Sequence, residues 1–170
     1  MDRPDSSLII RVSRGAGTGL TRLAAFDHAL RIAGVADFNL VRLSSVIPPG
    51  AEVVESEPAG QVGGGHGDLL YCVYADAYSS TPGEAAWAGI TWAQHSDGSG
   101  AGLFAEHSGW SRHDVELQLH HSVEAMIAGR APGFRPAGTM LSSITCESNP
   151  VCAVVVASYR TVSWNDGGPP

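Results

Sequence analysis

The feature that most constrains the fold of this chain is a serine pair, Ser44-Ser45, which lies between an apolar segment and a double proline. Residues 38–43 are mostly apolar or β-branched, and this pattern predicts a strand that runs into the pair. Pro48 forces the residue before it into an extended conformation, and Pro49 continues the restriction. The peptide between the two serines is therefore held between a strand and a rigid exit.

Such a serine pair has two possible roles. In the first, the Ser45 hydroxyl attacks the carbonyl carbon of Ser44 to give an ester. β-Elimination then leaves a dehydroalanine, which loses ammonia and becomes a pyruvoyl group. In the second, the pair is only a polar turn at the end of a strand. The pair by itself favours the turn, because other serine pairs occur in the chain, namely Ser6-Ser7, Ser79-Ser80 and Ser142-Ser143.

Length and charge set the class of protein. At 170 residues the chain fits one domain, residues 1–170, with a sizeable core. Its hydrophobic content is 44% and its formal net charge is −7. Nucleic acids and anionic membrane surfaces attract basic proteins, so neither is an expected partner. An acidic protein is compatible with a cationic small molecule as its ligand.

The location follows from what the sequence lacks. Residues 1–7 have no apolar segment of the kind found in signal peptides. No stretch approaches the roughly 18 continuous apolar residues of a membrane-spanning helix. The three cysteines (Cys72, Cys146 and Cys152) lack the paired spacing of a zinc site and are expected to be reduced core thiols. These observations predict a cytoplasmic protein.

The N-terminal segments predict a strand, a loop and a helix. Residues 7–13 form the strand, and residues 21–33 form the helix, with Thr21 as its N-cap and Gly34 as its C-terminal stop. Residues 14–19 contain three glycines and predict a flexible loop. A loop of this kind can bind phosphate, but the Rossmann third glycine and the Walker lysine are both missing. A small nucleotide-binding domain is therefore an unfavoured alternative.

Asp27 is the first candidate site residue. The helix pattern places it on the same face as Leu23 and Leu30, which we expect to be apolar. A carboxylate on a buried face costs several kcal/mol unless it has a partner. That partner is either an arginine of the protein or the cationic end of a substrate, and position alone does not decide between them.

The rest of the chain predicts strands and one long helix. The strands cover residues 69–79, 84–94, 101–108, 137–147 and 151–161, and the helix covers residues 111–129. The strand at residues 84–94 is apolar on both faces, which predicts that it is covered on both sides. The first three of these strands follow one another through short links, which predicts antiparallel pairing among them.

Two further groups of polar side chains are candidates for function. Glu106 lies in the apolar strand at 101–108, on the face of Phe104, and is either an exposed strand glutamate or a functional carboxyl. The helix at 111–129 carries His113, His120 and His121. Only two possible metal ligands share one face of this helix and no cysteine joins them, so we expect solvated histidines and no metal.

The segment Asn-Leu-Val-Arg-Leu-Ser-Ser-Val-Ile-Pro-Pro-Gly, residues 39–50, resembles the processing site of the pyruvoyl-dependent arginine decarboxylases. The resemblance extends over nearly the whole chain. It includes the helix around Asp27, the Tyr74-Ala75 strand, the sequence Pro82-Gly83-Glu84, the strand around Glu106 and the long helix that follows. The set at matching offsets is far more specific than any single motif.

This resemblance implies an α+β fold, a four-layer αββα sandwich with mainly antiparallel sheets. It also implies self-cleavage between Ser44 and Ser45 into a β chain, residues 1–44, and an α chain, residues 45–170. The two chains stay associated, and family members assemble as trimers of αβ units with active sites between neighbouring units. The cofactor would be the covalent pyruvoyl group made from Ser45.

The resemblance also assigns roles. Substrate condenses with the pyruvoyl group as a Schiff base, and loss of CO₂ would turn arginine into agmatine, in polyamine biosynthesis. Glu106 would be the proton donor, for which a low-polarity pocket suits a carboxyl. Asp27, eighteen positions before Ser45, would bind the substrate guanidinium, for which a carboxylate is well shaped. Asn39, six positions before Ser45, would help to position the reacting groups.

Some features depart from the family pattern. The tryptophans at positions 87, 92, 110 and 164, the glycine run at 63–65 and the histidine-rich helix are not expected of these decarboxylases. They leave open a decarboxylase of another amino acid, or a non-catalytic trimeric member that serves as a binding module.

Overall fold

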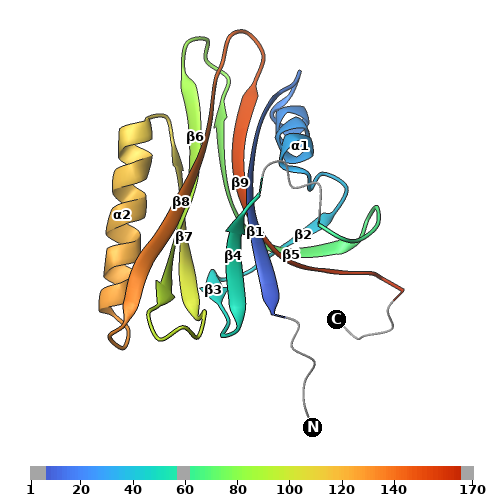
Figure 1. Ribbon diagram of the computed structural model, residues 1–170. Helices are drawn as coiled ribbons and strands as arrows, with labels where there is room; N and C mark the ends of the chain where they lie inside the picture. The colour runs from blue at the N-terminus through green and yellow to red at the C-terminus, as the bar shows by residue number, and fades with distance from the viewer. Residues whose placement is uncertain (1–6, 57–61, 166–170) are drawn as a thin grey trace.

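A computed structural model describes residues 7–56 and 62–165 of the chain. Those residues form nine strands and two helices (Figure 1). In chain order they are β1 (Leu8–Thr18), α1 (Arg22–Ala33), β2 (Asn39–Arg42), β3 (Val46–Ile47), β4 (Ala51–Glu55), β5 (Leu69–Ser79), β6 (Ala85–His95), β7 (Gly102–Gly109), α2 (Arg112–Ala128), β8 (Phe134–Thr145) and β9 (Val151–Val162).

The strands form two sheets. The first has the order β2-β5-β9-β1-β4 and the second the order β3-β7-β6-β8. In the first sheet, β9 pairs antiparallel with both β5 and β1, while β2 and β4 add parallel at the two edges. Every pairing in the second sheet is antiparallel. The sheets are therefore mainly antiparallel, as predicted.

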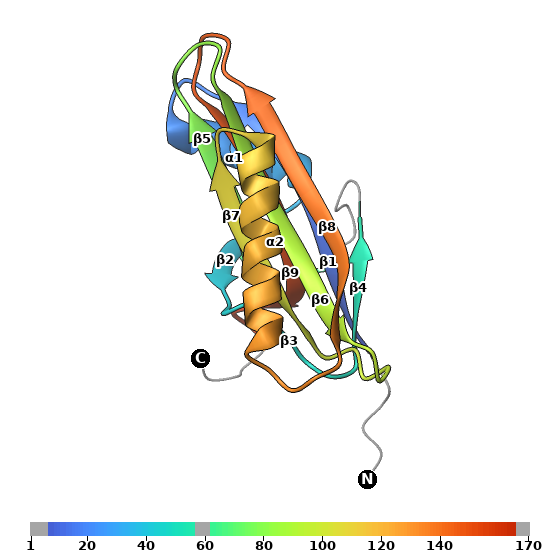
Figure 2. The same cartoon turned by 90° about the vertical axis from the view of Figure 1, so that its left-hand side faces the viewer.

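Three hydrophobic clusters separate four layers. The largest cluster lies between the two sheets and includes Ile90, Phe104 and Val155. A second cluster joins α1 to the outer face of the first sheet, and a third joins α2 to the outer face of the second (Figures 1 and 2). The alternating side chains of β9 thus enter two different clusters, and all of residues 151–158 are buried. The predicted αββα sandwich is confirmed.

Capping residues define the helix ends. The Thr21 hydroxyl accepts a hydrogen bond from the backbone N–H of Ala24, and Gly34 ends α1 in the left-handed conformation at φ 80°. The Ser111 hydroxyl accepts from the N–H of Asp114 at the start of α2. Both helices therefore begin where the sequence predicted.

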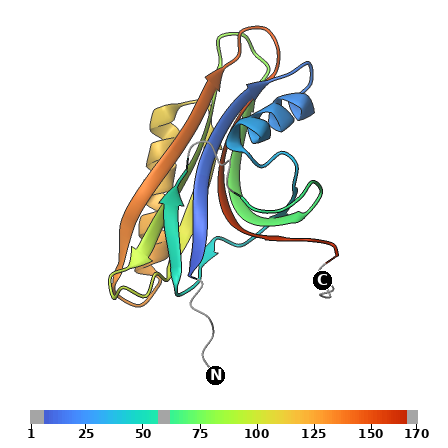
Figure 3. The ribbon, with the colours of Figure 1, turned by 45° about the vertical axis from the view of Figure 1, so that its right-hand side comes forward.

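The glycine-rich segment after residue 13 was predicted wrongly as a loop. It continues β1 to Thr18, with α1 packed directly over it (Figure 3). A Cβ on Gly15 would lie 2.0 Å from the carbonyl oxygen of Ala29, and one on Gly17 would lie 2.5 Å from the Ala29 nitrogen. The glycines serve close packing between helix and strand, so this segment does not form a phosphate loop.

The buried face of α1 also differs from the prediction. Leu23 is 77% exposed and Leu20 is 86% exposed, whereas Ala25, Ala29 and Ala33 are fully buried. Because the helix lies so close to the glycines of β1, alanines fit the contact and leucines do not. The face that carries Leu23 and Asp27 is the solvent face of α1.

The predicted pairing of three successive strands holds only in part. β6 and β7 pair antiparallel, but β5 belongs to the other sheet and packs against β6 across the core. In the described residues, neither helix is long and apolar enough to cross a membrane. Cys72, Cys146 and Cys152 are free and buried, as expected.

Candidate active site

The chain crosses from one sheet to the other at the serine pair. β2 forms an edge of the first sheet, and β3 forms an edge of the second. Just before the pair, the N–H of Leu43 donates to the carbonyl oxygen of Cys72 at 2.9 Å. Just after it, Val46 pairs with Leu103 of β7. The peptide between Ser44 and Ser45 is therefore a short bridge between two anchored edges.

Ser45 has an unusual backbone conformation. Its φ is 70°, and it is the only non-glycine residue with positive φ in the part of the chain that the structure describes. Its carbonyl oxygen accepts a 2.8 Å hydrogen bond from the N–H of Phe104, and the residue is 8% exposed. A serine in this region of backbone space is strained unless its surroundings hold it, and such strain gathers at functional sites. The neighbouring Ser44 is exposed.

A carboxylate meets the Ser45 side chain. Ser45 Oγ donates to Glu106 Oε1 at 2.7 Å. Glu106 lies on β7 and pairs with Ile90 of β6, so it lies on the core face of the sheet, the face that the sequence pattern indicated. It is half-buried. The structure thus brings together two of the predicted site residues, which are 61 positions apart in the sequence.

Tyr159 is a third member of this group, and the sequence analysis missed it. Its hydroxyl donates to the carbonyl oxygen of Val46 at 2.9 Å, and its ring packs edge-on against Phe104 with centroids 6.1 Å apart. Burial raises the pKa of Tyr159, and the nearby charge of Glu106 raises it further. The hydroxyl therefore stays protonated as a donor. The sequence does carry a signal for Tyr159. It follows Val155 and Ala157 at every second position, so strand alternation places it on the inward face.

An open pocket lies beside this group. It has a volume of about 660 Å³ and is lined by Leu43, Tyr71, Tyr159 and Arg160 together with residues 7–9 at the start of β1. Leu43 and Tyr159 border both the pocket and the serine bridge, so the pocket adjoins the site.

Asp27 is not brought to this group within one chain. It lies on α1 with 59% of its side chain exposed, and its Oδ2 is 3.2 Å from Nε of Arg31, one helical turn further on. The arginine partner that the sequence left open is therefore observed. Because both side chains are largely exposed, the pair contributes little to stability.

Asn39 also lies apart from Ser45. It is exposed at the start of β2, and its Nδ2 donates to the carbonyl oxygen of Gly67 at 2.7 Å. Its amide satisfies the backbone at a strand end, which is the structural role that an asparagine commonly has. In the described residues, no group of three or more histidine, cysteine, aspartate or glutamate side chains is arranged to hold a metal.

Together, fold and site define a two-sheet α+β sandwich with a strained serine and a carboxylate at the crossover between its sheets. A family model described as pyruvoyl-dependent arginine decarboxylase matches residues 9–161. The chain therefore belongs to the pyruvoyl-dependent arginine decarboxylase family.

Individual relatives agree with this assignment. A pyruvoyl-dependent arginine decarboxylase of Thermococcus sibiricus is 32% identical over 152 residues, which cover 89% of this chain and 92% of the relative. One of Pyrococcus horikoshii is 34% identical over 140 residues, covering 82% and 86%. One of Halobacterium salinarum is 42% identical over 97 residues, covering 57% and 58%. The similarity to the Thermococcus and Pyrococcus proteins covers at least 82% of this chain and at least 86% of each relative.

Proposed function

We propose that this chain cuts itself between Ser44 and Ser45 and then, as a carboxy-lyase, converts arginine to agmatine and CO₂. The observation that carries the proposal is the hydrogen bond from Ser45 Oγ to Glu106 in a residue held at φ 70°. Family membership supplies the arginine chemistry. The uncut chain would be a zymogen, and its single domain would persist as a β chain, residues 1–44, bound to an α chain, residues 45–170.

Self-cleavage needs a nucleophile and a group that takes its proton. The proton on Ser45 Oγ has an acceptor in Glu106 at 2.7 Å. Oγ attacks the carbonyl carbon of Ser44, and the C–N bond breaks as the amine of residue 45 takes up a proton. β-Elimination then removes the Cα proton of residue 45 and breaks its Cβ–O bond, which leaves a carboxylate on Ser44 and a dehydroalanine at position 45. The dehydroalanine tautomerises to an imine, and water hydrolyses the imine to the ketone with release of ammonia.

The residues around Ser45 fit the pyruvoyl group. Its position is buried, and the backbone that would carry the ketone is fixed by the N–H of Phe104. When present, the pyruvoyl group withdraws the electron pair that CO₂ leaves behind. Glu106 lies 2.7 Å from the Ser45 hydroxyl and therefore faces the position that the ketone would occupy. We assign Glu106 the delivery of a proton to the substrate carbon from which CO₂ has departed.

Substrate recognition by Asp27 requires a second chain. Asp27 is exposed, and the exposed Leu23 on the same helix gives it an apolar neighbour. A homotrimer with active sites between subunits would bring this face of α1 to the serine bridge of the next subunit. We propose that assembly and the guanidinium role of Asp27 together, in a cytoplasmic protein whose three cysteines remain reduced. Asn39, supported by its offset from Ser45, would position the reacting groups.

Intact mass spectrometry followed by an amino-acid screen for CO₂ release tests this function. We expect two fragments that meet at the 44–45 bond, the larger one lighter by one ammonia than a fragment that begins with serine. Arginine should release CO₂ faster than lysine, ornithine or an aromatic amino acid. An active protein that consists of one uncut chain would overturn the proposal. Cleaved protein that acts on another amino acid, or on none, would overturn its arginine part.

A further inference from the structure

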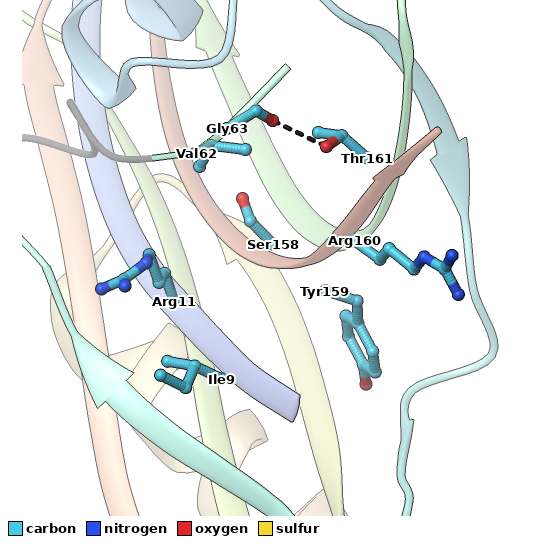
Figure 4. A pocket seen from close by; sticks show the side chains of 8 residues that line it. All are labelled: Ile9, Arg11, Val62, Gly63, Ser158, Tyr159, Arg160 and Thr161. Atoms are coloured by element: carbon cyan, nitrogen blue, oxygen red, sulfur yellow. Dashed lines mark hydrogen bonds between the residues drawn. The ribbon is translucent and has the colours of Figure 1, made fainter. Parts of the chain in front are cut away.

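Tyr159 lies at an irregularity in the pairing of β9 with β5. The pairing with β5 matches Cys72 with Ser158 and Tyr71 with Arg160, so Tyr159 is an extra residue in the ladder. Figure 4 shows its ring pointing to the opposite side from the Ser158 side chain. Such bulges re-aim a side chain and are common beside active sites. Tyr159 keeps the inward direction of Val155 and Ala157, and from the bulge its hydroxyl reaches from the first sheet to the edge of the second.

The target of that hydroxyl is a carbonyl group that its own sheet leaves free. Among the residues that the structure describes, β3 is an edge strand with β7 as its one neighbour in the sheet. The carbonyl of Ser45 faces β7 and accepts from Phe104, while the next carbonyl, that of Val46, accepts from Tyr159. Two consecutive carbonyls after the scissile peptide are therefore held from two different sheets.

We propose that Tyr159 is a positioning residue for self-cleavage: by holding the Val46 carbonyl, its hydroxyl keeps Ser45 in the left-handed conformation that presents Oγ to Glu106. This inference rests on the proposed function. Without the bond, the two-residue strand β3 has one sheet partner, and Ser45 is free to relax toward an ordinary φ. Relaxation would separate Oγ from its proton acceptor and slow the attack on Ser44.

The alternative role for Tyr159 is packing alone, because its ring also contacts Phe104 in the core. The variant Tyr159→Phe separates the two roles, since it keeps the ring and removes only the hydroxyl. Tyr71→Phe is the matched control. Tyr71 lines the same pocket, and in the described part of the chain its hydroxyl makes no hydrogen bond.

The experiment follows the appearance of the two fragments in freshly translated full-length chain. We expect Tyr159→Phe to slow cleavage about 10-fold, the effect of losing one ordinary hydrogen bond, and Tyr71→Phe to leave the rate unchanged. Hydroxylamine, which cuts esters, should release no extra fragment from Tyr159→Phe, because the slowed step precedes the ester. Melting temperature and oligomeric state should match those of the wild type.

Two results would overturn the inference. One is Tyr159→Phe cleaving at the wild-type rate, and the other is both variants slowing equally. If the wild-type chain itself remains uncut, the proposed function fails instead, so the two failures are distinguishable.

Discussion

The serine bridge and the solvent face of α1 differ in how complete they are. At the bridge, Ser45 between the sheets, Glu106 on β7 and Tyr159 on β9 already contact their partners within one chain. On α1, Asp27 is exposed, and its carboxylate pairs with Arg31 of the same helix. The first region holds the groups that the proposed self-cleavage would use. The second region has a charged group and neighbouring apolar side chains but nothing to enclose a substrate.

This difference separates two steps in the life of the protein. Self-cleavage uses groups of a single chain, so its rate should not depend on protein concentration. In the proposed function, decarboxylation would use Asp27 as well and should depend on assembly. Variants on α1 should therefore change decarboxylation and leave cleavage unchanged, whereas variants at the serine bridge can change cleavage itself.

Ser45→Ala should abolish cleavage completely, because no hydroxyl remains to attack the Ser44 carbonyl. No CO₂ should be released, since the pyruvoyl group cannot form. Intact mass spectrometry gives the answer directly. Ser44→Ala is the matched control: Ser44 is exposed and supplies only its backbone carbonyl, so this variant should still cleave. A cut Ser45→Ala chain would exclude Ser45 as the nucleophile.

Glu106→Gln should still cleave but more slowly, because the amide oxygen of glutamine accepts the Ser45 hydrogen bond and keeps Oγ in place but cannot take up its proton. It should lose about 100-fold to 10,000-fold in decarboxylation, the usual contribution of a general acid. The measurement is kcat on fully cleaved protein. Glu84→Gln serves as control, because Glu84 likewise accepts a serine hydroxyl, from Ser79 at 2.9 Å. Normal turnover in Glu106→Gln would remove Glu106 from the mechanism.

Asp27→Asn should leave cleavage unchanged and raise KM for arginine about 10-fold to 100-fold, as expected for the loss of a charged hydrogen bond. Steady-state kinetics with arginine provide the measurement. Asp37→Asn removes another exposed carboxylate, one that pairs with His66, and should change neither quantity. An Asp27→Asn enzyme with unchanged KM would refute the guanidinium assignment. Slowed cleavage in this variant would contradict the separation of the two regions.

Arg31→Gln should have the smallest effect. An exposed ion pair on a helix is worth about 0.5 kcal/mol or less, so the melting temperature should barely change. Releasing Asp27 from Arg31 should lower KM for arginine by about twofold. Thermal denaturation and steady-state kinetics measure the two effects. A raised KM would show that Arg31 assists binding rather than competing for Asp27.

Local chemistry made much of the fold predictable. The ends of both helices follow from Thr21, Gly34 and Ser111, which act on neighbouring residues only. The face of Glu106 follows from strand alternation, and the strand at residues 69–79 was predicted to the residue. In each case the decisive interactions connect residues close in sequence or follow from strand periodicity.

The errors have a common cause in distant contacts. Gly15 and Gly17 suggest a loop locally, but the helix packed over them explains why they are glycine. The same packing selects alanines and leaves Leu23 in solvent. Alternation indicates the inward direction of Tyr159, but its hydroxyl meets a backbone carbonyl 113 positions away, which no local pattern indicates. The proposed role of Asp27 would likewise follow from distant contacts, those between one subunit and the next.

The position of β1 has a consequence for the cleaved protein. With the proposed cut, this strand would belong to the first fragment, yet it lies in the sheet between β9 and β4, which would both belong to the second. Separating the fragments would require pulling out an interior strand along its whole length. Two pieces produced separately could rebuild the same sandwich, but the second would begin with an ordinary serine amine and no ketone. The pyruvoyl group can therefore form only in a chain made with the bond between residues 44 and 45 intact. The fold itself does not need that bond once it has been cut.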